Sequence, residues 1–174
     1  MQKASEVIGR TVVAREGGKT IGKVKEIVLN QSGTRVLGFV IDEGLFKSDK
    51  VVAWGAVLAI GPDSVVISSP ASVVKVNEAP DIKSVLDKRL NVRGTRLQTT
   101  TGKDLGKIDD YQFDETSGNV IGFELSGGVF ADVFKGKSFL PTPSTLELGQ
   151  ELSFVGPEAE ATLQDSSGNL REGS

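Results

Sequence analysis

The chain contains no histidine and no cysteine, and only one methionine, one tryptophan and one tyrosine among its 174 residues. Without histidine and cysteine it cannot form a Ser-His-Asp triad, a cysteine nucleophile, a disulfide or the usual zinc site with nitrogen and sulfur ligands. Catalysis would have to use carboxylates, lysines or a bound cofactor, and the sequence shows no such constellation. We therefore expect a protein that is not an enzyme, with no catalytic residue, no cofactor and no metal site.

Long apolar segments are also missing. The longest apolar run, VVAWGAVLAIG at residues 51–61, is about half of what a bilayer span requires. We expect this run to form two strands that turn near Gly55, with Trp54 in the core. The N-terminal residues MQKASEVIGR lack the apolar region of an export signal. These patterns predict a cytoplasmic protein without direct membrane insertion.

The charge is small and uneven. The formal net charge is −3, and residues 157–174 alone carry four acidic residues and one arginine, which leaves residues 1–156 neutral. A general nucleic-acid binder should instead show a basic excess. The last segment has no sustained apolar pattern, so we expect residues 157–174 to form a flexible acidic tail.

The dominant feature is an internal repeat. The stretch at residues 18–44, GKTIGKVKEIVLNQSGTRVLGFVIDEG, returns 84 residues later at 102–128 as GKDLGKIDDYQFDETSGNVIGFELSGG. Aligned without gaps, residues 10–44 and 94–128 share nine identities, where unrelated segments would share roughly two. The identical pairs are Thr11/Thr95, Gly18/Gly102, Lys19/Lys103, Gly22/Gly106, Lys23/Lys107, Val36/Val120, Gly38/Gly122, Phe39/Phe123 and Gly44/Gly128. The protein is thus one unit used twice.

Each copy has the pattern of strands separated by tight turns. Glycines mark the hairpin tips, and apolar residues alternate between them, which is typical of a half-buried antiparallel sheet. The opposite face is apolar in the first copy, where it carries Val28, Val36 and Val40. Neighbouring apolar residues on an outer face predict a covered patch. The cover would be the other half of the chain, a second subunit or a protein partner, and we take the three valines as the candidate partner interface.

These residues carry a resemblance. The run G-K-x-x-G-K-V/I, a strand, a turn ending in glycine and then V-x-G-F resembles the PRC-barrel domain, the small β-barrel found in the photosynthetic reaction-centre H subunit and in a ribosome-maturation factor. The resemblance covers both repeats. It implies an all-β fold of two tandem small antiparallel β-barrels, each six-stranded, and a binding or scaffold role.

The repeat and its flanks predict the domain organisation. We expect a first barrel at residues 1–76, a connector at 77–92 and a second barrel at 93–156, before the tail. The connector should start a short helix at Pro80 and Asp81. Its apolar residues recur at helical spacing and would form a stripe that docks on a barrel: Ile82, Val85, Leu86 and Leu90.

Two functional hypotheses follow. The first is a non-catalytic tandem-barrel adaptor or scaffold that binds a protein partner or forms a homo-oligomer through the valine face. The alternative is an RNA-binding or ribosome-assembly accessory factor, which the resemblance to the maturation factor implies. Its RNA contacts would be three arginines in and after the basic connector: Arg89, Arg93 and Arg96. No aromatic residue lies near them in the sequence to stack on a base. The adaptor is therefore favoured.

Overall fold

The structure is a computed structural model that describes residues 1–45 and 47–165. The chain begins with two short elements, β1 (Gln2–Lys3) and α1 (Ala4–Val7). The strands of the first repeat are β2 (Thr11–Ala14), β3 (Lys19–Leu29), β4 (Val36–Asp42), β5 (Lys50–Ala53), β6 (Val57–Ile60), β7 (Ser64–Ile67) and β8 (Val73–Val74). Three short 3-10 turns lie between these strands, η1 (Glu16–Gly18), η2 (Trp54–Ala56) and η3 (Pro70–Ser72), and a fourth, η4 (Val76–Glu78), follows β8.

Helix α2 (Pro80–Asp87) leads into the second repeat. Its strands are β9 (Arg96–Thr99), β10 (Asp104–Phe113), β11 (Val120–Ser126), β12 (Lys137–Pro141), β13 (Leu152–Val155) and β14 (Gln164–Asp165). The 3-10 helix η5 (Pro157–Thr162) precedes β14. The architecture is therefore all-β with few helices, as the sequence predicts.

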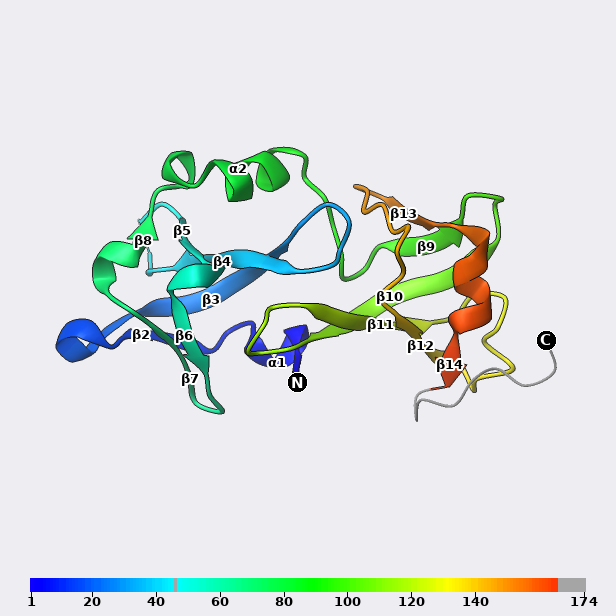
Figure 1. The fold of residues 1–174 in the computed structure, drawn as a ribbon, viewed down its shortest axis with the longest axis horizontal. Helices are drawn as coiled ribbons and strands as arrows, with labels where there is room; N and C mark the ends of the chain where they lie inside the picture. The colour runs from blue at the N-terminus through cyan, green and yellow to red at the C-terminus, as the bar shows by residue number, and fades with distance from the viewer. Residues whose placement is uncertain (46, 166–174) are drawn as a thin grey trace. The chain divides into compact units, whose positions relative to one another are not determined.

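The two repeats use the same strand order. In the first, the order is β6-β7-β2-β3-β4-β5-β8, and in the second it is β13-β9-β10-β11-β12-β14 (Figure 1). Apart from β6, each strand of the first repeat therefore has a counterpart in the second. The internal repeat seen in the sequence is thus a repeat of structure.

One aspect of the strand pairing differs from the antiparallel expectation. Strands β2 and β7 pair in parallel, and so do their counterparts β9 and β13. Parallel pairing needs a long connection, and here the chain forms four strands between β2 and β7 and three between β9 and β13. The alternation of apolar and polar residues predicts which side chains lie on each face of a strand, but not whether the neighbouring strand runs parallel or antiparallel. The parallel pairing could therefore not be predicted from the sequence pattern.

The chain forms two compact units that are not contiguous halves. Unit 1 consists of Met1–Asn30, Arg35–Lys88 and Phe113–Asn119, and unit 2 of Gln31–Thr34, Arg89–Gln112 and Val120–Ser174. Each unit therefore includes a hairpin turn that belongs, in sequence, to the other repeat.

In unit 1, the turn at residues 113–119, which belongs to the second repeat in sequence, packs on Trp54, the only tryptophan of the chain. The ring of Trp54 lies edge-on to Phe39 and to Phe113, with centroid distances of 6.1 and 6.2 Å. The backbone N–H of Val36 donates a hydrogen bond of 2.8 Å to the carbonyl of Gly118. Trp54 thus joins the sheet of unit 1 to the 113–119 turn.

In unit 2, backbone hydrogen bonds hold the turn at residues 31–34. The N–H of Val120 donates to the carbonyl of Thr34 at 2.8 Å, and the N–H of Leu148 donates to the carbonyl of Gln31 at 3.2 Å. Phe123, Leu125 and Leu140 form part of the fully buried core of this unit.

The beginning of the predicted flexible tail is ordered. Residues 157–165 form η5 and β14, and Ala159 and Leu163 are almost completely buried. Two buried side chains in a short segment anchor it to the barrel, although its composition is polar. The prediction of a tail from residue 157 is therefore wrong for residues 157–165, and the rest of that segment lies outside the described residues.

Candidate functional site

The predicted valine face is covered by the chain itself. Val28 and Val40 are 2% and 5% exposed and cluster with Val51 and with Ile82 from α2. Val85 and Leu86 of the same helix pack against this cluster, and Figure 1 shows α2 lying beside the β4–β5 part of the sheet. The Ile82, Val85 and Leu86 part of the connector stripe therefore docks on the first barrel, as predicted, whereas Leu90 lies beyond the end of α2 and outside this cluster. Because its own helix covers them, these valines are core residues, and a partner interface at this face is wrong.

A β-bulge separates Val36 from the other two valines. The β3–β4 register shifts between Val28, which pairs with Gly38, and Leu29, which pairs with Val36. Val36 is 1% exposed and lies outside the cluster, whereas Leu37 packs against it. An extra residue in one strand reverses the faces of the residues beyond it. Strict alternation therefore assigned Val36 to the wrong face.

The equivalent face of unit 2 has another cover. In unit 1, Ile82 of α2 lies over Gly38, whereas in unit 2 the ring of Phe139 lies over Gly122. Beside it, the amide of Gln112 donates a hydrogen bond of 3.2 Å to Glu124. In unit 2, Phe139 of β12 thus covers Gly122, and no helix has to pack on this face. Polar residues therefore suit positions 112 and 124, where the first copy has the valines that contact α2.

The three predicted RNA-contact residues all lie in unit 2, after α2. Arg96 forms an ion pair with Asp104 at 2.6 Å, and Arg93 lies 3.9 Å from Asp110 and donates to the carbonyl of Asp109 at 3.3 Å. Arg89 is exposed and has a positive φ of 53° at the end of the helix. Two of the three guanidinium groups therefore already have carboxylate partners that a phosphate would have to displace.

Exposed aliphatic side chains mark two other loops. Leu45 is 86% exposed in the loop between β4 and β5, called here the first loop (residues 43–45 and 47–49). Val129 and Val133 are 53% and 54% exposed between β11 and β12, in the second loop (residues 127–136). Leu45 and Val129 are 84 residues apart, so they occupy the same position of the two repeats, directly after the shared Gly44/Gly128 pair. The aligned segments, residues 10–44 and 94–128, end at these glycines, so the repeated aliphatic position lies one residue beyond them in the sequence.

Internal contacts brace the second loop. The N–H of Gly127 donates to the carbonyl of Gly136 at 3.0 Å, and the N–H of Phe134 donates to the carbonyl of Phe130 at 3.1 Å. Phe134 is 7% exposed and anchors the loop, while Lys103 lies 5.0 Å above the ring of Phe130. Val129 and Val133 thus stay exposed on an ordered loop, which reduces the entropy lost when they are buried by a partner.

A cleft of about 520 Å³ opens beside the first loop. Its lining comes from the first loop, the start of β5 and the η4 turn, and consists of Glu43, Lys47, Ser48, Asp49, Lys50, Lys75, Val76 and Asn77. Lys25 forms an ion pair with Asp49 at 2.6 Å, which raises the pKa of the Lys25 ammonium. Next to Lys25, desolvation raises the pKa of the Glu26 carboxyl, although the side chain as a whole is exposed.

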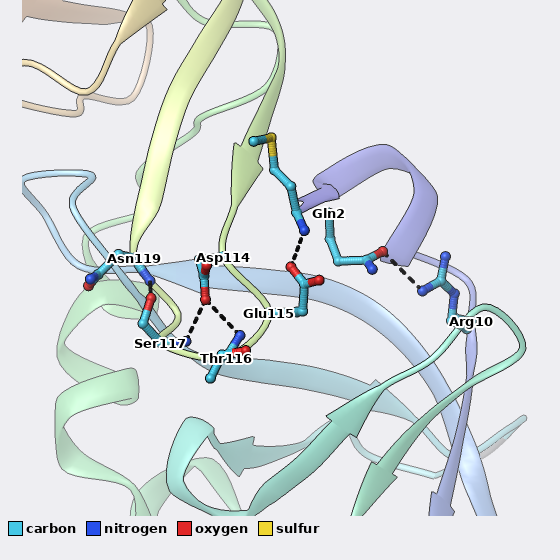
Figure 2. Close-up of polar contacts among 8 residues, drawn as sticks. Gln2, Arg10, Asp114, Glu115, Thr116, Ser117 and Asn119 are labelled. Atoms are coloured by element: carbon cyan, nitrogen blue, oxygen red, sulfur yellow. Dashed lines mark hydrogen bonds and ion pairs between the residues drawn. The ribbon is translucent and has the colours of Figure 1, made fainter.

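The 113–119 turn of unit 1 is the other polar cluster (Figure 2). Its Asp114 carboxylate accepts hydrogen bonds from the N–H groups of Ser117 and Thr116, each 2.8 Å, and these bonds lower the pKa of Asp114. Glu115 pairs with the amino group of Met1, which lowers the pKa of Glu115. The contacts all fix the turn, so we assign this cluster a structural role.

Two further observations concern metals and membranes. Among residues 1–45 and 47–165, no three histidine, cysteine or acidic side chains come together as a metal site would require. Within the same described ranges, no helix is long and apolar enough to cross a bilayer.

The model of the PRC-barrel domain matches the chain at residues 1–74 and 89–150. The chain belongs to the PRC-barrel family. The two matched segments follow the two repeats, so the protein is a tandem PRC-barrel chain, as the glycine and apolar motifs predict. A comparison with curated proteins gives no match to this tandem PRC-barrel chain.

Proposed function

We propose that the tandem PRC-barrel chain is a non-catalytic adaptor that binds a protein partner through its first and second loops. The observation that carries this proposal is the exposed aliphatic residue at the same position of both repeats, Leu45 and Val129. Isolated exposed aliphatic residues are ordinary on protein surfaces. A repeated one is different, because most other positions of the two copies have diverged.

The chemistry of the loops supports a protein as the partner. Leu45 in the first loop, and Val129 and Val133 in the second, each offer apolar surface for a partner to bury, and lysines lie near it within each loop. Interfaces combine such an apolar centre with a polar rim. The chain has neither histidine nor cysteine to act as a general base or nucleophile near neutral pH, so binding is the role that these loops suit.

The test uses the full chain, tagged at its native level in its own cells and purified with and without nuclease. The loop variant combines Leu45→Ser, Val129→Ser and Val133→Ser, and the matched control is Leu58→Ser, an equally apolar residue that is 50% exposed in β6. We expect a defined, nuclease-resistant protein to be retained by the wild type and the control and lost by the loop variant. Binding should then be reconstituted with the purified partner.

Other results would change the assignment. Retention of the same partner by the loop variant would contradict the proposal. Recovery of RNA-bound proteins that disappear with nuclease and with charge reversal at Arg89 and Arg93 would favour the RNA alternative. Light scattering on the purified chain separates a second copy of the chain from a different protein as the partner. A cytoplasmic location is part of the proposal, and fractionation of the same cells tests it.

A further inference from the structure

The lining of the cleft beside the first loop has a small excess of positive charge. Three lysines face two carboxylates there. One carboxylate, Asp49, is paired with Lys25, which lies outside the lining, and the other, Glu43, lies 3.4 Å from Lys50. Among the described residues, Lys47 and Lys75 have no acidic group within ion-pair distance. Two ammonium groups are therefore available to a ligand.

The two free lysines come from separate segments. Lys47 belongs to the first loop, whereas Lys75 lies between β8 and η4, and strand β8 pairs with β5, the strand that follows the loop. The β5–β8 pairing therefore brings Lys47 and Lys75, which are 28 residues apart in sequence, to the wall of one cleft. A ligand with two separated negative charges would engage both segments.

The volume of the cleft and the apolar residues near it restrict the class of ligand further. A volume of about 520 Å³ lies within the roughly 300–1,000 Å³ of pockets that enclose ligands of moderate size. Val76 contributes a half-buried aliphatic group to the lining, and the exposed Leu45 precedes Lys47 by two residues. A short acidic peptide that also carries an aliphatic residue matches this combination of charge, volume and apolar surface.

A membrane surface matches the cleft less well than an acidic peptide does. Recruitment to anionic lipid uses clusters of about four to eight basic residues or a basic amphipathic helix on an outward face. Here two unpaired lysines stand on the wall of a concave cleft, next to Glu43 and Asp49. A concave wall with charges of both signs can select a peptide by the spacing of its carboxylates.

We propose that the cleft binds an acidic segment of the protein partner, with carboxylates on Lys47 and Lys75 and an aliphatic side chain against Leu45. This inference rests on the adaptor function and specifies the chemistry of the partner. It also gives the first loop a role that the second loop does not share.

The experiment is an NMR titration of the ¹⁵N-labelled full chain with the probe peptide acetyl-Glu-Leu-Glu-Glu-amide. The comparison peptide, acetyl-Lys-Leu-Lys-Lys-amide, has the opposite charge. We expect saturable shift changes confined to the first loop and to residues 74–78 with the acidic peptide only. The affinity should fall when salt rises from about 50 to about 300 mM, because the contact is electrostatic.

Charge reversal tests the two lysines directly. The double variant Lys47→Glu, Lys75→Glu should lose at least about tenfold in affinity, since both attractions become repulsions. The matched control Lys19→Glu, Lys107→Glu changes the net charge equally at exposed positions of β3 and β10 that do not line the cleft, and should bind as the wild type does. The dispersion of the amide spectrum shows that each variant is folded.

Three outcomes would overturn the inference. They are equal binding of both peptides, equal loss of affinity in the two double variants, and no binding of the acidic peptide, whether or not the first loop binds vesicles of phosphatidylcholine and phosphatidylglycerol. The adaptor function fails separately, when the Leu45, Val129 and Val133 variant retains its partner. Loss of that partner together with no peptide binding would therefore leave the adaptor and remove only the acidic-peptide site.

Discussion

Replacement of Gly118 by alanine gives the most direct test of how the 113–119 turn is held in unit 1. A β-carbon at Gly118 would lie 2.8 Å from Cε2 and 3.0 Å from Nε1 of Trp54. The indole is in turn in contact with Phe39 and Phe113. The ring therefore cannot move away without disturbing the aromatic packing.

The expected magnitude has two parts. Gly118 has a φ of 79°, and a left-handed backbone costs a residue other than glycine about 1–2 kcal/mol. The contact with Trp54 adds the cost of overpacking, about 1–3 kcal/mol. Gly118→Ala should therefore lower the free energy of unfolding of unit 1 by about 2–5 kcal/mol.

Gly17→Ala is the matched control in the same unit. Its φ is 76°, close to that of Gly118, but a β-carbon at Gly17 would have Cγ of Lys19 as its nearest atom, at 3.9 Å, which is an ordinary contact. This variant carries only the backbone cost of about 1–2 kcal/mol. The difference between the two variants isolates the packing of Trp54 on the turn.

Urea unfolding followed by tryptophan fluorescence is the assay, because Trp54 is the only tryptophan and reports on unit 1. The slope of the transition shows whether the variants change only stability. Equal destabilisation by Gly118→Ala and Gly17→Ala would refute the packing of Trp54 against the turn. A Gly118→Ala variant as stable as the wild type would refute the backbone conformation as well.

Three further predictions use the same assay or its pH dependence. Val40→Glu, which introduces the residue of the second copy beneath α2, should destabilise unit 1 by about 3 kcal/mol or more, and the reasoning fails if stability is unchanged. Glu26→Gln should stabilise the protein at neutral pH, because the raised pKa of Glu26 means that its ionised form is disfavoured in the folded state; the gain should vanish below about pH 4, where both states are protonated. Asp114→Ala should lower the urea midpoint at pH 7. Because the pKa of Asp114 is lowered by folding, its contribution is present above about pH 4 and disappears as the pH falls through the native pKa, so a pH-independent effect would contradict it.

Much of the architecture follows from local sequence. The glycines at the hairpin tips have the positive φ that those turns require, with 57° at Gly18 and 89° at Gly102. The stripe of Ile82, Val85 and Leu86 identifies a helix that must bury one side, and it does so on the first barrel. These features depend on residues close together in the chain, which is why periodicity and turn chemistry predict them.

The candidate site was harder to predict. An apolar face on a strand indicates that other residues pack on it, but it does not show whether they belong to a partner or to a distant helix of the same chain. For Val28 and Val40 the cover was α2. Exposure of Leu45 and Val129 could be known only from the folded chain, because it depends on which aliphatic side chains the cores bury. Pairing of Arg96 with Asp104 likewise depends on the β9–β10 hairpin, and it removes charge that the sequence counts as free.

By itself, the sequence determined the duplication, the all-β class, the PRC-barrel family and the lack of histidine and cysteine chemistry, because these depend on residue types and their spacing. The tertiary structure decided which apolar faces are buried, which lysines remain unpaired and where the compact units divide. Unit 1 includes the turn at Phe113–Asn119 because Trp54 packs on it, although that turn belongs to the second repeat in sequence. Burial and pairing are properties of contacts between distant segments, and they exist only after the chain has folded.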